Sequence, residues 1–270
     1  MPLEIHPVTL HQKDMEERYS RNRLYVSKEE QETIKGVRIL LAGAGMNSII
    51  AECALRFGFE CMTIIDGDKV DESCLDHQNF TKSDVGKYKA ETLAKRLLKI
   101  NPNANITFHN RFLDKDNSEE MIEGHDIAIN TLGYDSDMPF VFDEICSKKN
   151  ISVLHPYNFG WAGLLTIVKP GGYLLTEITP DYRDFELSMA KFVMRHFEFW
   201  NVQIDWLKDS IRKYSREKGS MPIPQLSIGS WLAASHCVNA MFNLVTKRHV
   251  RTFPKFYMST ILENPPMKVD

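Results

Sequence analysis

The sequence predicts an α/β protein with a Rossmann-like, doubly wound and mostly parallel sheet, antiparallel C-terminal strands and an N-terminal helical arm. Short apolar runs alternate with helical segments between residues 36 and 155, as in parallel sheets that carry helices on both faces. A glycine-rich loop at 43–45 joins the first strand to the next helix. After residue 160 two strand-like runs follow each other closely, which indicates antiparallel pairing.

The individual elements follow from hydrophobic patterning. Residues 8–34 are polar, with irregularly spaced apolar positions, and predict one or two helical segments. Apolar runs predict strands at 37–42, 61–65, 106–108, 126–131, 151–155, 163–168, 173–178 and 256–262. Helical periodicity and stop signals predict helices at 47–57, 87–100, 140–149, 183–218 and 226–247. The aromatic residues of 183–218 are interpreted as packing residues, and the Met-Pro-Ile-Pro run at 221–224 separates the last two helices.

We interpret residues 1–270 as a single domain, because this length suits one large α/β unit with a sizeable core. Its parts are an N-terminal helical arm (1–35), a nucleotide-binding core (36–169), a variable helical segment (170–223) and a C-terminal helix and strand that complete the sheet (224–270).

Composition argues against several classes of function. The net charge of −3 favours neither nucleic acid nor a membrane surface as a partner. No apolar run reaches eighteen residues, and the N-terminus does not resemble a secretory signal. The five cysteines are isolated, without a Cys-x-x-Cys pair, so we expect no disulfide framework, no zinc and a cytoplasmic location.

The loop Gly43-Ala44-Gly45 is the clearest functional signal. Its first glycine permits a tight turn after the strand, and its second lets the backbone approach a phosphate at the helix N-terminus. Asp66 ends the next strand, where an acid can accept hydrogen bonds from ribose hydroxyls. The alternative is a plain turn with a turn-forming acid, since Asp66-Gly67-Asp68 is also good turn chemistry. The pair fits NAD as well as ATP.

Further motifs resemble the ThiF/MoeB/HesA family, the ubiquitin-activating-type adenylyltransferases. The resemblance is clearest over residues 18–135 and returns at 224–229. It rests on Arg-Tyr-Ser-Arg-Asn-Arg at 18–23, Asp-Gly-Asp-Lys-Val-Asp at 66–71, Leu-Asp-His-Gln-Asn-Phe at 75–80 and Asp-Val-Gly-Lys-Tyr-Lys-Ala-Glu at 84–91.

The resemblance implies an enzyme that uses ATP and magnesium to adenylate the C-terminal carboxylate of a small ubiquitin-like or sulfur-carrier protein. It implies a homodimer in which Arg21 reaches the ATP of the other subunit, and Lys89 as the catalytic lysine. The cofactor-binding residues that it implies are Gly43, Ala44 and Gly45 at the phosphates, Asp66 at the ribose, Phe112 near the adenine, and Asp68, His77 and Gln78 in the neighbouring motifs.

The residue types suit this chemistry. A carboxylate nucleophile is already ionised at pH 7, so the reaction needs cations rather than a general base. Lys89 and Arg21 supply them, although Lys89 has an alternative interpretation as a solvated lysine in the first turn of a helix. The family's magnesium acid falls on Gly133, so Asp135, and after it Asp137, is the expected substitute; both are otherwise loop acids.

Three departures from the family pattern are present. Cys74 and His77 stand where asparagine and a phosphate-contacting arginine are usual, and Ser48 replaces the third glycine of the loop. No cysteine lies between Cys146 and Cys237, so we expect the reaction to end at adenylation. The departures leave a non-catalytic binding subunit of the same fold as one alternative and an NAD-dependent oxidoreductase as another.

Overall fold

The computed structural model describes residues 16–217 and 223–262. The predicted break at 221–224 is therefore described only at Ile223 and Pro224, and residues 1–15 of the predicted arm lie outside the description, as do Lys218 and the last eight residues. Among the described residues, no helix is both long and apolar enough to cross a lipid bilayer.

The strands are β1 (Arg38–Ala42), β2 (Cys61–Ile65), β3 (Asn105–His109), β4 (Ile127–Asn130), β5 (Ser152–Asn158), β6 (Gly163–Val168) and β7 (Phe256–Ser259). The helices are α1 (Lys28–Lys35), α2 (Asn47–Phe57), α3 (Lys89–Ile100), α4 (Ser118–Ile122), α5 (Met138–Lys148), α6 (Phe185–Phe199), α7 (Asp205–Glu217) and α8 (Ser227–Val245). Short 3-10 helices are η1 (Glu17–Asn22), η2 (Glu72–Cys74), η3 (Lys82–Asp84), η4 (Leu175–Glu177) and η5 (Tyr182–Asp184).

The seven described strands form one sheet in the order β3-β2-β1-β4-β5-β6-β7. The five strands from β3 to β5 pair in parallel, whereas β5, β6 and β7 pair antiparallel. The predicted fold class is confirmed. Because the strand order reverses between β1 and β4, their carboxyl ends open a crevice, which is the usual ligand site of such sheets.

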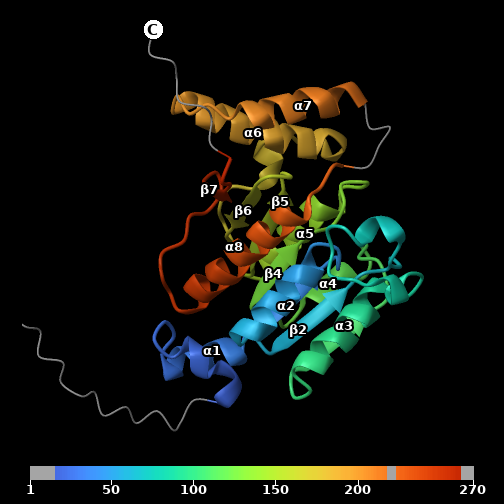
Figure 1. Ribbon diagram of the computed structural model, residues 1–270, viewed down its shortest axis with the longest axis vertical. Coiled ribbons are helices and arrows are strands. Elements are labelled where there is room, and N and C mark those ends of the chain that lie inside the picture. The colour runs from blue at the N-terminus through green and yellow to red at the C-terminus, as the bar shows by residue number, and fades with distance from the viewer. Residues whose placement is uncertain (1–15, 218–222, 263–270) are drawn as a thin grey trace, which may run out of the picture.

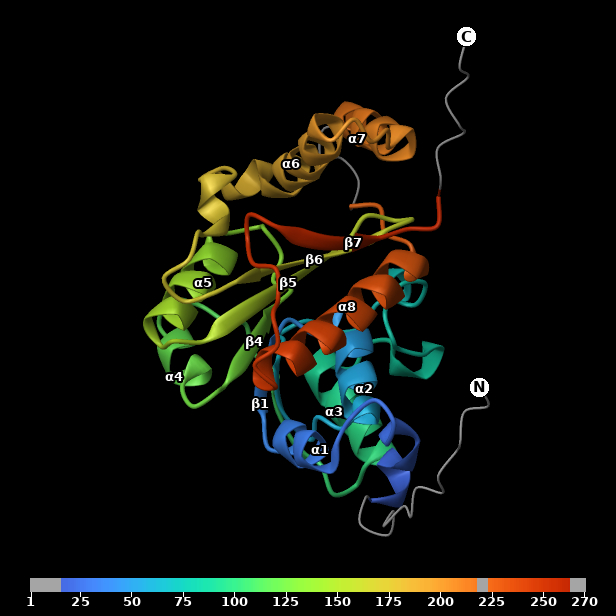
Figure 2. The same ribbon diagram turned by 90° about the vertical axis from the view of Figure 1, so that its left-hand side faces the viewer.

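Helices cover both faces of the sheet (Figures 1 and 2). α2, α3 and α8 lie on one face, and α4 and α5 lie on the other. The pair α6 and α7 stands apart, beyond β6 and β7 and at the opposite end of the molecule from α1. Each region has its own apolar cluster, and the cluster of α6 and α7 is centred on Phe185, Met189 and Val193.

Two predicted elements are wrong. Residues 173–178 form no strand but a turn around η4, because β7 pairs with the free edge of β6. Leu174, Leu175 and Ile178 pack against the Phe185 cluster instead. The single helix predicted at 183–218 is a pair, since α6 ends before Asn201, whose φ of 53° lies in the left-handed region. The break lets α7 pack back along α6 as a helical hairpin.

Candidate active site

A cavity of about 890 Å³ lies at the carboxyl ends of β1, β2 and β4. One end is lined by residues that follow these strands, among them Gly43, Asp66 and Thr131. This end coincides with the topological switch point, where α/β sheets of this kind bind nucleotides. The cavity continues from there under α6 and α7, so that two different sets of side chains face one space.

The loop after β1 has the geometry that the glycine pattern predicts. Gly43 has a φ of +83°, and a Cβ on it would lie 2.8 Å from Thr131 Oγ1, so a larger residue would be strained and would collide with the end of β4. Asn47, the first residue of α2, donates from its amide to Gly43 O at 2.7 Å and to Thr131 Oγ1 at 3.0 Å. Gly43 and Gly45 both line the cavity.

Asp66 ties the end of β2 to this loop. Its carboxylate accepts from the N–H of Ala44 at 2.6 Å and from the N–H of Asp68 at 2.7 Å. Burial raises the pKa of Asp66, and the two N–H groups and the charge of Lys89 oppose that rise. Asp66 is thus a turn acid that also lines the cavity. Ala44, predicted to contact the phosphates, is fully buried and is not among the residues that line the cavity; its N–H donates to Asp66.

Lys89 is not a solvated lysine. It is the first residue of α3, is only 9% exposed and lines the cavity, with Nζ 3.5 Å from Asp68 Oδ2. The nearby Lys82 and Lys87 are exposed and pair with Glu72 and Asp84. Lys89 is therefore the one lysine among the described lining residues.

Gln78 and His77 contact each other, with 3.1 Å between their Nε2 atoms, but only Gln78 lines the cavity. Gln78 lines the cavity beside Gly45, where a Cβ would lie 3.4 Å from Nε2 of Gln78. His77 does not line the cavity, and its Nδ1 lies 2.5 Å from Asp76 Oδ1. The histidine at the position of the family's phosphate-contacting arginine therefore places no charge in the site.

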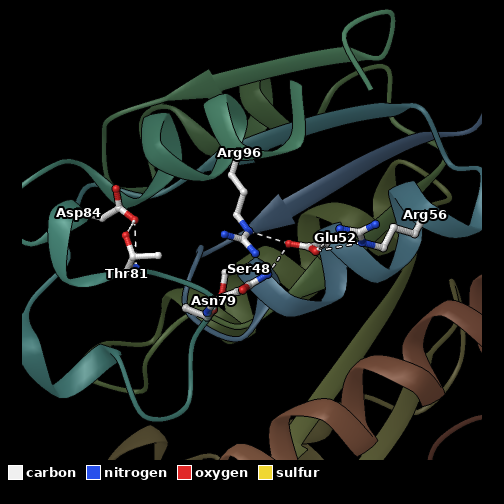
Figure 3. A network of polar contacts seen from close by, with 8 residues as sticks. Ser48, Glu52, Arg56, Asn79, Thr81, Asp84 and Arg96 are labelled. Carbon is white, nitrogen blue, oxygen red and sulfur yellow. Dashed lines mark hydrogen bonds and ion pairs between the residues drawn. The ribbon is translucent and has the colours of Figure 1, made fainter. Parts of the chain in front are cut away.

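A polar network holds the loop that carries Gln78 against the phosphate loop (Figure 3). The Ser48 hydroxyl donates to Gly45 O at 2.6 Å and accepts from Asn79 N at 2.9 Å. Glu52, one turn further along α2, accepts from Asn79 Nδ2 and from Arg96 Nε, both at 2.6 Å, and it also pairs with Arg56. Ser48, which replaces the third glycine of the loop, therefore joins two binding loops.

Phe112 and Arg111 follow β3 and line the cavity beside Asp66. The Phe112 ring is 64% exposed and lies so close to Gly67 that a Cβ there would be 2.6 Å from Cδ2. An exposed ring at this place offers a flat face to a base. Arg111 was not predicted, although its place after β3, next to the strand that ends at Asp66, is a signal for it.

The carboxylate of Asp135, the predicted magnesium ligand, lies beside Gly133, which has no side chain of its own. Both line the cavity, and a Cβ on Gly133 would lie 3.2 Å from Asp135 Oδ2. Asp137 pairs with Lys115 at 2.7 Å and does not line the cavity. Glu186, on α6, also lines the cavity and was not predicted from the sequence. Burial, and then the charge of Asp135, raise the pKa of Glu186 to about 7.

A buried polar group supports the loop that carries Asp135. Asn130 donates to Asp143 Oδ1 at 3.0 Å and to Pro139 O, and accepts from Leu132 N. Asp143 Oδ2 lies 3.0 Å from His155 Nε2, and both side chains are almost fully buried. The sequence signal was a charged residue within an apolar helix and a histidine ending an apolar strand.

The other end of the cavity, which we call the α6–α7 compartment, has a carbon-rich lining. Its main walls come from the hairpin between β5 and β6 and from the two helices, namely Tyr157, Phe159, Trp161, Ala190, Ile211 and Tyr214. It opens directly into the space beside Asp135 and Glu186.

Arg21 and the cysteines lie outside this site. Arg21 is exposed on η1 and does not line its own chain's cavity. The thiols of Cys146 and Cys237 are buried, which raises the pKa of each. No cysteine is among the described residues that line the cavity.

With the geometry in place, comparison with known proteins decides the family. A model of the ThiF family matches residues 19–215. The chain belongs to the ThiF family. This confirms the resemblance seen in the sequence and agrees with the strand order and with the phosphate loop of this member.

Individual ThiF relatives are similar over part of the chain. A probable molybdopterin-synthase adenylyltransferase from Porphyra purpurea is 31% identical over 174 residues, covering 62% of this chain and 43% of the relative. SAMP-activating enzyme E1 from Haloferax volcanii is 25% identical over 162 residues, covering 58% of this chain and 59% of that enzyme. The chain thus spans about half the length of these curated relatives.

The fold extends further than the sequence similarity. The crystal structure of E. coli MccB with ATP superposes with a TM-score of 0.62 at 16% identity, covering 96% of this chain and 75% of MccB. This likeness includes the C-terminal half of this ThiF-family chain and shows that its fold as a whole is shared.

Proposed function

We propose that this ThiF-family chain is an ATP-dependent adenylyltransferase that activates the C-terminal carboxylate of a small ubiquitin-like or sulfur-carrier protein. The observation that carries the proposal is the single cavity that joins the phosphate loop, Asp66 and buried Lys89 to the open α6–α7 compartment. A loop and an acid alone suit NAD equally. A buried cation beside them suits the transfer of a charged phosphoryl group.

The reaction requires little covalent chemistry from the protein. One carboxylate oxygen forms a bond to the α-phosphorus of ATP, and the bond from that phosphorus to the bridging oxygen breaks. The electron pair leaves with pyrophosphate, and no proton is removed because the nucleophile is ionised at neutral pH. Lys89, held at the mouth of the loop by α3 and Asp68, stabilises the charge that develops on the phosphate oxygens.

The remaining residues orient the nucleotide. Gly43 and Gly45 admit the phosphates to the start of α2, Asp66 binds the ribose, and Phe112 packs on the adenine. Asp68 and Gln78 flank them. These assignments place the α-phosphate between Lys89 and the α6–α7 compartment.

Magnesium fits the site on the chemistry of its donors. Mg²⁺ is usually held by one or two carboxylates together with waters and substrate phosphates, and Asp135 presents a carboxylate where Gly133 has no side chain. Asp135 would hold the ion, which would neutralise charge on the phosphates. Within the described residues, no group of three or more acids, histidines or cysteines is placed to hold a metal ion by itself.

We further propose that the enzyme stops at the acyl-adenylate and acts as a homodimer. The first part of this proposal is supported by the lining of the cavity, which includes no cysteine among the described residues. Arg21 is exposed on η1 and is not among the residues that line its own cavity, which supports a role on the ATP of a second copy.

One observation favours a second candidate, a non-catalytic subunit that binds an active homologue. His77 is held by Asp76 outside the cavity, so the site has no cation at this position. A subunit of this kind would donate Arg21 to the partner and bind no ATP itself.

Ligand-induced thermal stabilisation tests the proposal. Mg-ATP at a hundred times its dissociation constant stabilises the native state by about 2.7 kcal/mol, a Tm rise of about 5–10 °C for a chain of this size. We expect this rise with Mg-ATP, none with NAD, and its loss in Asp66→Ala. Phe112→Ala, whose exposed ring contributes little to folding, should reduce it, whereas Asp116→Ala, an exposed acid outside the cavity, should not.

The alternatives give different results. A rise with NAD alone would support an oxidoreductase. No rise with either nucleotide, together with co-purification of an active homologue, would support the binding subunit.

A further inference from the structure

The side chain of Asn130 fastens both ends of the loop that carries Asp135. At the start of the loop, Asn130 Oδ1 accepts from Leu132 N at 3.2 Å. At its end, Asn130 Nδ2 donates to Pro139 O, in the first turn of α5, at 3.0 Å. All of residues 131–136, between these two contacts, line the cavity. The position of the Asp135 carboxylate in the site therefore depends on Asn130.

Two buried ionisable side chains hold Asn130 in place. Asp143 Oδ1, one turn further along α5, accepts from Asn130 Nδ2 at 3.0 Å. The other oxygen of Asp143, Oδ2, lies 3.0 Å from Nε2 of His155 on β5. The side chains of Asp143 and His155 are only 3% and 2% exposed. Because β5 pairs with β4, the three side chains, which we call the Asn130–Asp143–His155 network, tie β4, α5 and β5 together.

Stability does not account for this buried pair. Phe142 and Ile145, on the same helix as Asp143, belong to an apolar cluster, so the surroundings would also accept apolar side chains. Taking a carboxylate and an imidazole out of water costs free energy, and apolar residues often replace such buried pairs without loss of stability. An apolar side chain at position 143 could not accept a hydrogen bond from Asn130. The specific contribution of the network is therefore the fixed orientation of the Asn130 amide.

A fixed orientation matters because of the metal that the site fits. Mg²⁺ demands near-ideal octahedral geometry at short distances, so a small displacement of a carboxylate weakens its binding. We propose that Asp143 and His155 are positioning residues, which act through Asn130 to hold the loop of Asp135 in the conformation that binds the magnesium of Mg-ATP. Neither lines the cavity, so neither touches the nucleotide. The proposal rests on the proposed function and adds the residues that set its metal site.

The contribution of magnesium to nucleotide affinity reports the position of Asp135. Titration calorimetry on the full chain gives dissociation constants for ATP with Mg²⁺, ATP with EDTA and AMP with EDTA. We expect Mg²⁺ to tighten ATP binding to wild type about tenfold or more, since partners that orient a metal ligand are worth about 10–100-fold. Asp135→Asn should remove most of this tightening. The affinity for AMP, which requires no metal, should stay within about twofold.

A paired substitution separates positioning from stability. Asp143→Ala/His155→Leu replaces the buried pair by apolar side chains of similar combined volume. It should unfold in urea near the wild-type midpoint and bind AMP normally, yet lose about tenfold or more of the magnesium tightening. Asn130→Ala, the second variant should the pair fail to fold, should lose it too.

Two further variants serve as controls on α5. Asp143→Asn keeps an oxygen that accepts from Asn130 and should retain the magnesium tightening. Glu144→Ala removes an exposed acid at the next position of the helix, outside the cavity, and should change nothing. Loss of tightening in Glu144→Ala equal to that of the paired variant would contradict the proposal.

A combined variant shows whether the network acts through Asp135. If it does, adding Asp135→Asn to the paired variant should weaken Mg-ATP by no more than about twofold further, because the two changes remove one interaction. Full additivity would overturn the proposal, as would normal magnesium tightening in the paired variant or in Asn130→Ala. Wild type that binds ATP equally with Mg²⁺ and with EDTA would overturn it while the nucleotide site stands. Failure of both AMP and ATP to bind would overturn the proposed function itself.

Discussion

The two ends of the cavity are built by different physics. At the nucleotide end, polar groups fix the backbone, as Asp66 does through Ala44 N and Ser48 through Gly45 O and Asn79 N. At the α6–α7 end, rings and aliphatic side chains around Phe185 fix the walls. Hydrogen bonds set atoms to within a few tenths of an ångström, as phosphate chemistry needs, whereas apolar packing sets a volume. The comparison shows that one cavity can fix the positions of atoms at its nucleotide end and fix only a volume at its α6–α7 end.

The largest expected effect is at the apolar end. Phe185→Ala removes a fully buried ring from the centre of the α6 cluster and should reduce the free energy of unfolding by about 3–5 kcal/mol in urea denaturation. It should also loosen the walls of the α6–α7 compartment, while the variant that remains folded keeps its Mg-ATP stabilisation. If Mg-ATP stabilisation disappeared as well, the two ends would not be independent.

Phe199→Ala is the matched control on the same helix. Its ring is 80% exposed, so the cost in stability should stay below about 0.5 kcal/mol. An equal loss in both variants would show that packing at Phe185 is not what stabilises α6.

At the nucleotide end we expect a loss of activity without a loss of stability. Lys89→Ala should leave stability almost unchanged but lower kcat/KM for ATP–pyrophosphate exchange by about 10²–10³-fold, because the lost charge acts on the transition state. Lys87→Ala removes an exposed lysine two residues away and should retain full activity. Intact ATP–pyrophosphate exchange in Lys89→Ala would refute the role of Lys89 in stabilising the transition state. It would also refute the contrast between a catalytic effect at the nucleotide end and a stability effect at the apolar end.

The same contrast explains what the sequence could predict. The nucleotide end is encoded locally, in a strand, a glycine loop and a helix, and the predicted elements at 47–57 and 61–65 agree with α2 and β2 to the residue. Gly43 was identified because its positive φ leaves little choice of residue. Ser48 was seen only as a departure, since its partner Asn79 lies in a separate loop.

The α6–α7 end depends on contacts between distant segments. The run at 173–178 has the composition of a strand, but β7 from the far end of the chain takes the edge of β6. The run at 183–218 carries apolar residues at intervals on both sides of Asn201 and has no glycine or proline there, so the sequence pattern does not mark the turn at Asn201. Glu186 and Tyr157 reach the cavity only through this arrangement, and no local pattern could assign them.

The response of stability to pH separates the two ends by sign. Burial alone would raise the pKa of Glu52, but hydrogen bonds from Arg96, Arg56 and Asn79 outweigh it and lower that pKa. Its contribution to stability is therefore present above the unfolded-state value near pH 4.3 and is lost as the pH falls below it. Glu186 behaves in the opposite way, since burial raises its pKa to about 7. Its contribution is complete below about pH 4.3 and is lost as the pH rises through 7.

Urea denaturation from pH 3.5 to 8 in magnesium-free buffer measures both. Relative to wild type, Glu186→Gln should gain about 3 kcal/mol between pH 5 and 8, since about 1.4 kcal/mol accompanies each pKa unit. Glu52→Gln should be less stable than wild type at pH 7, and the difference should shrink as the acid limit is approached. Parallel pH profiles for the two variants would mean that the carboxylates share one environment, because only a polar network at one end and an apolar wall at the other give shifts of opposite sign.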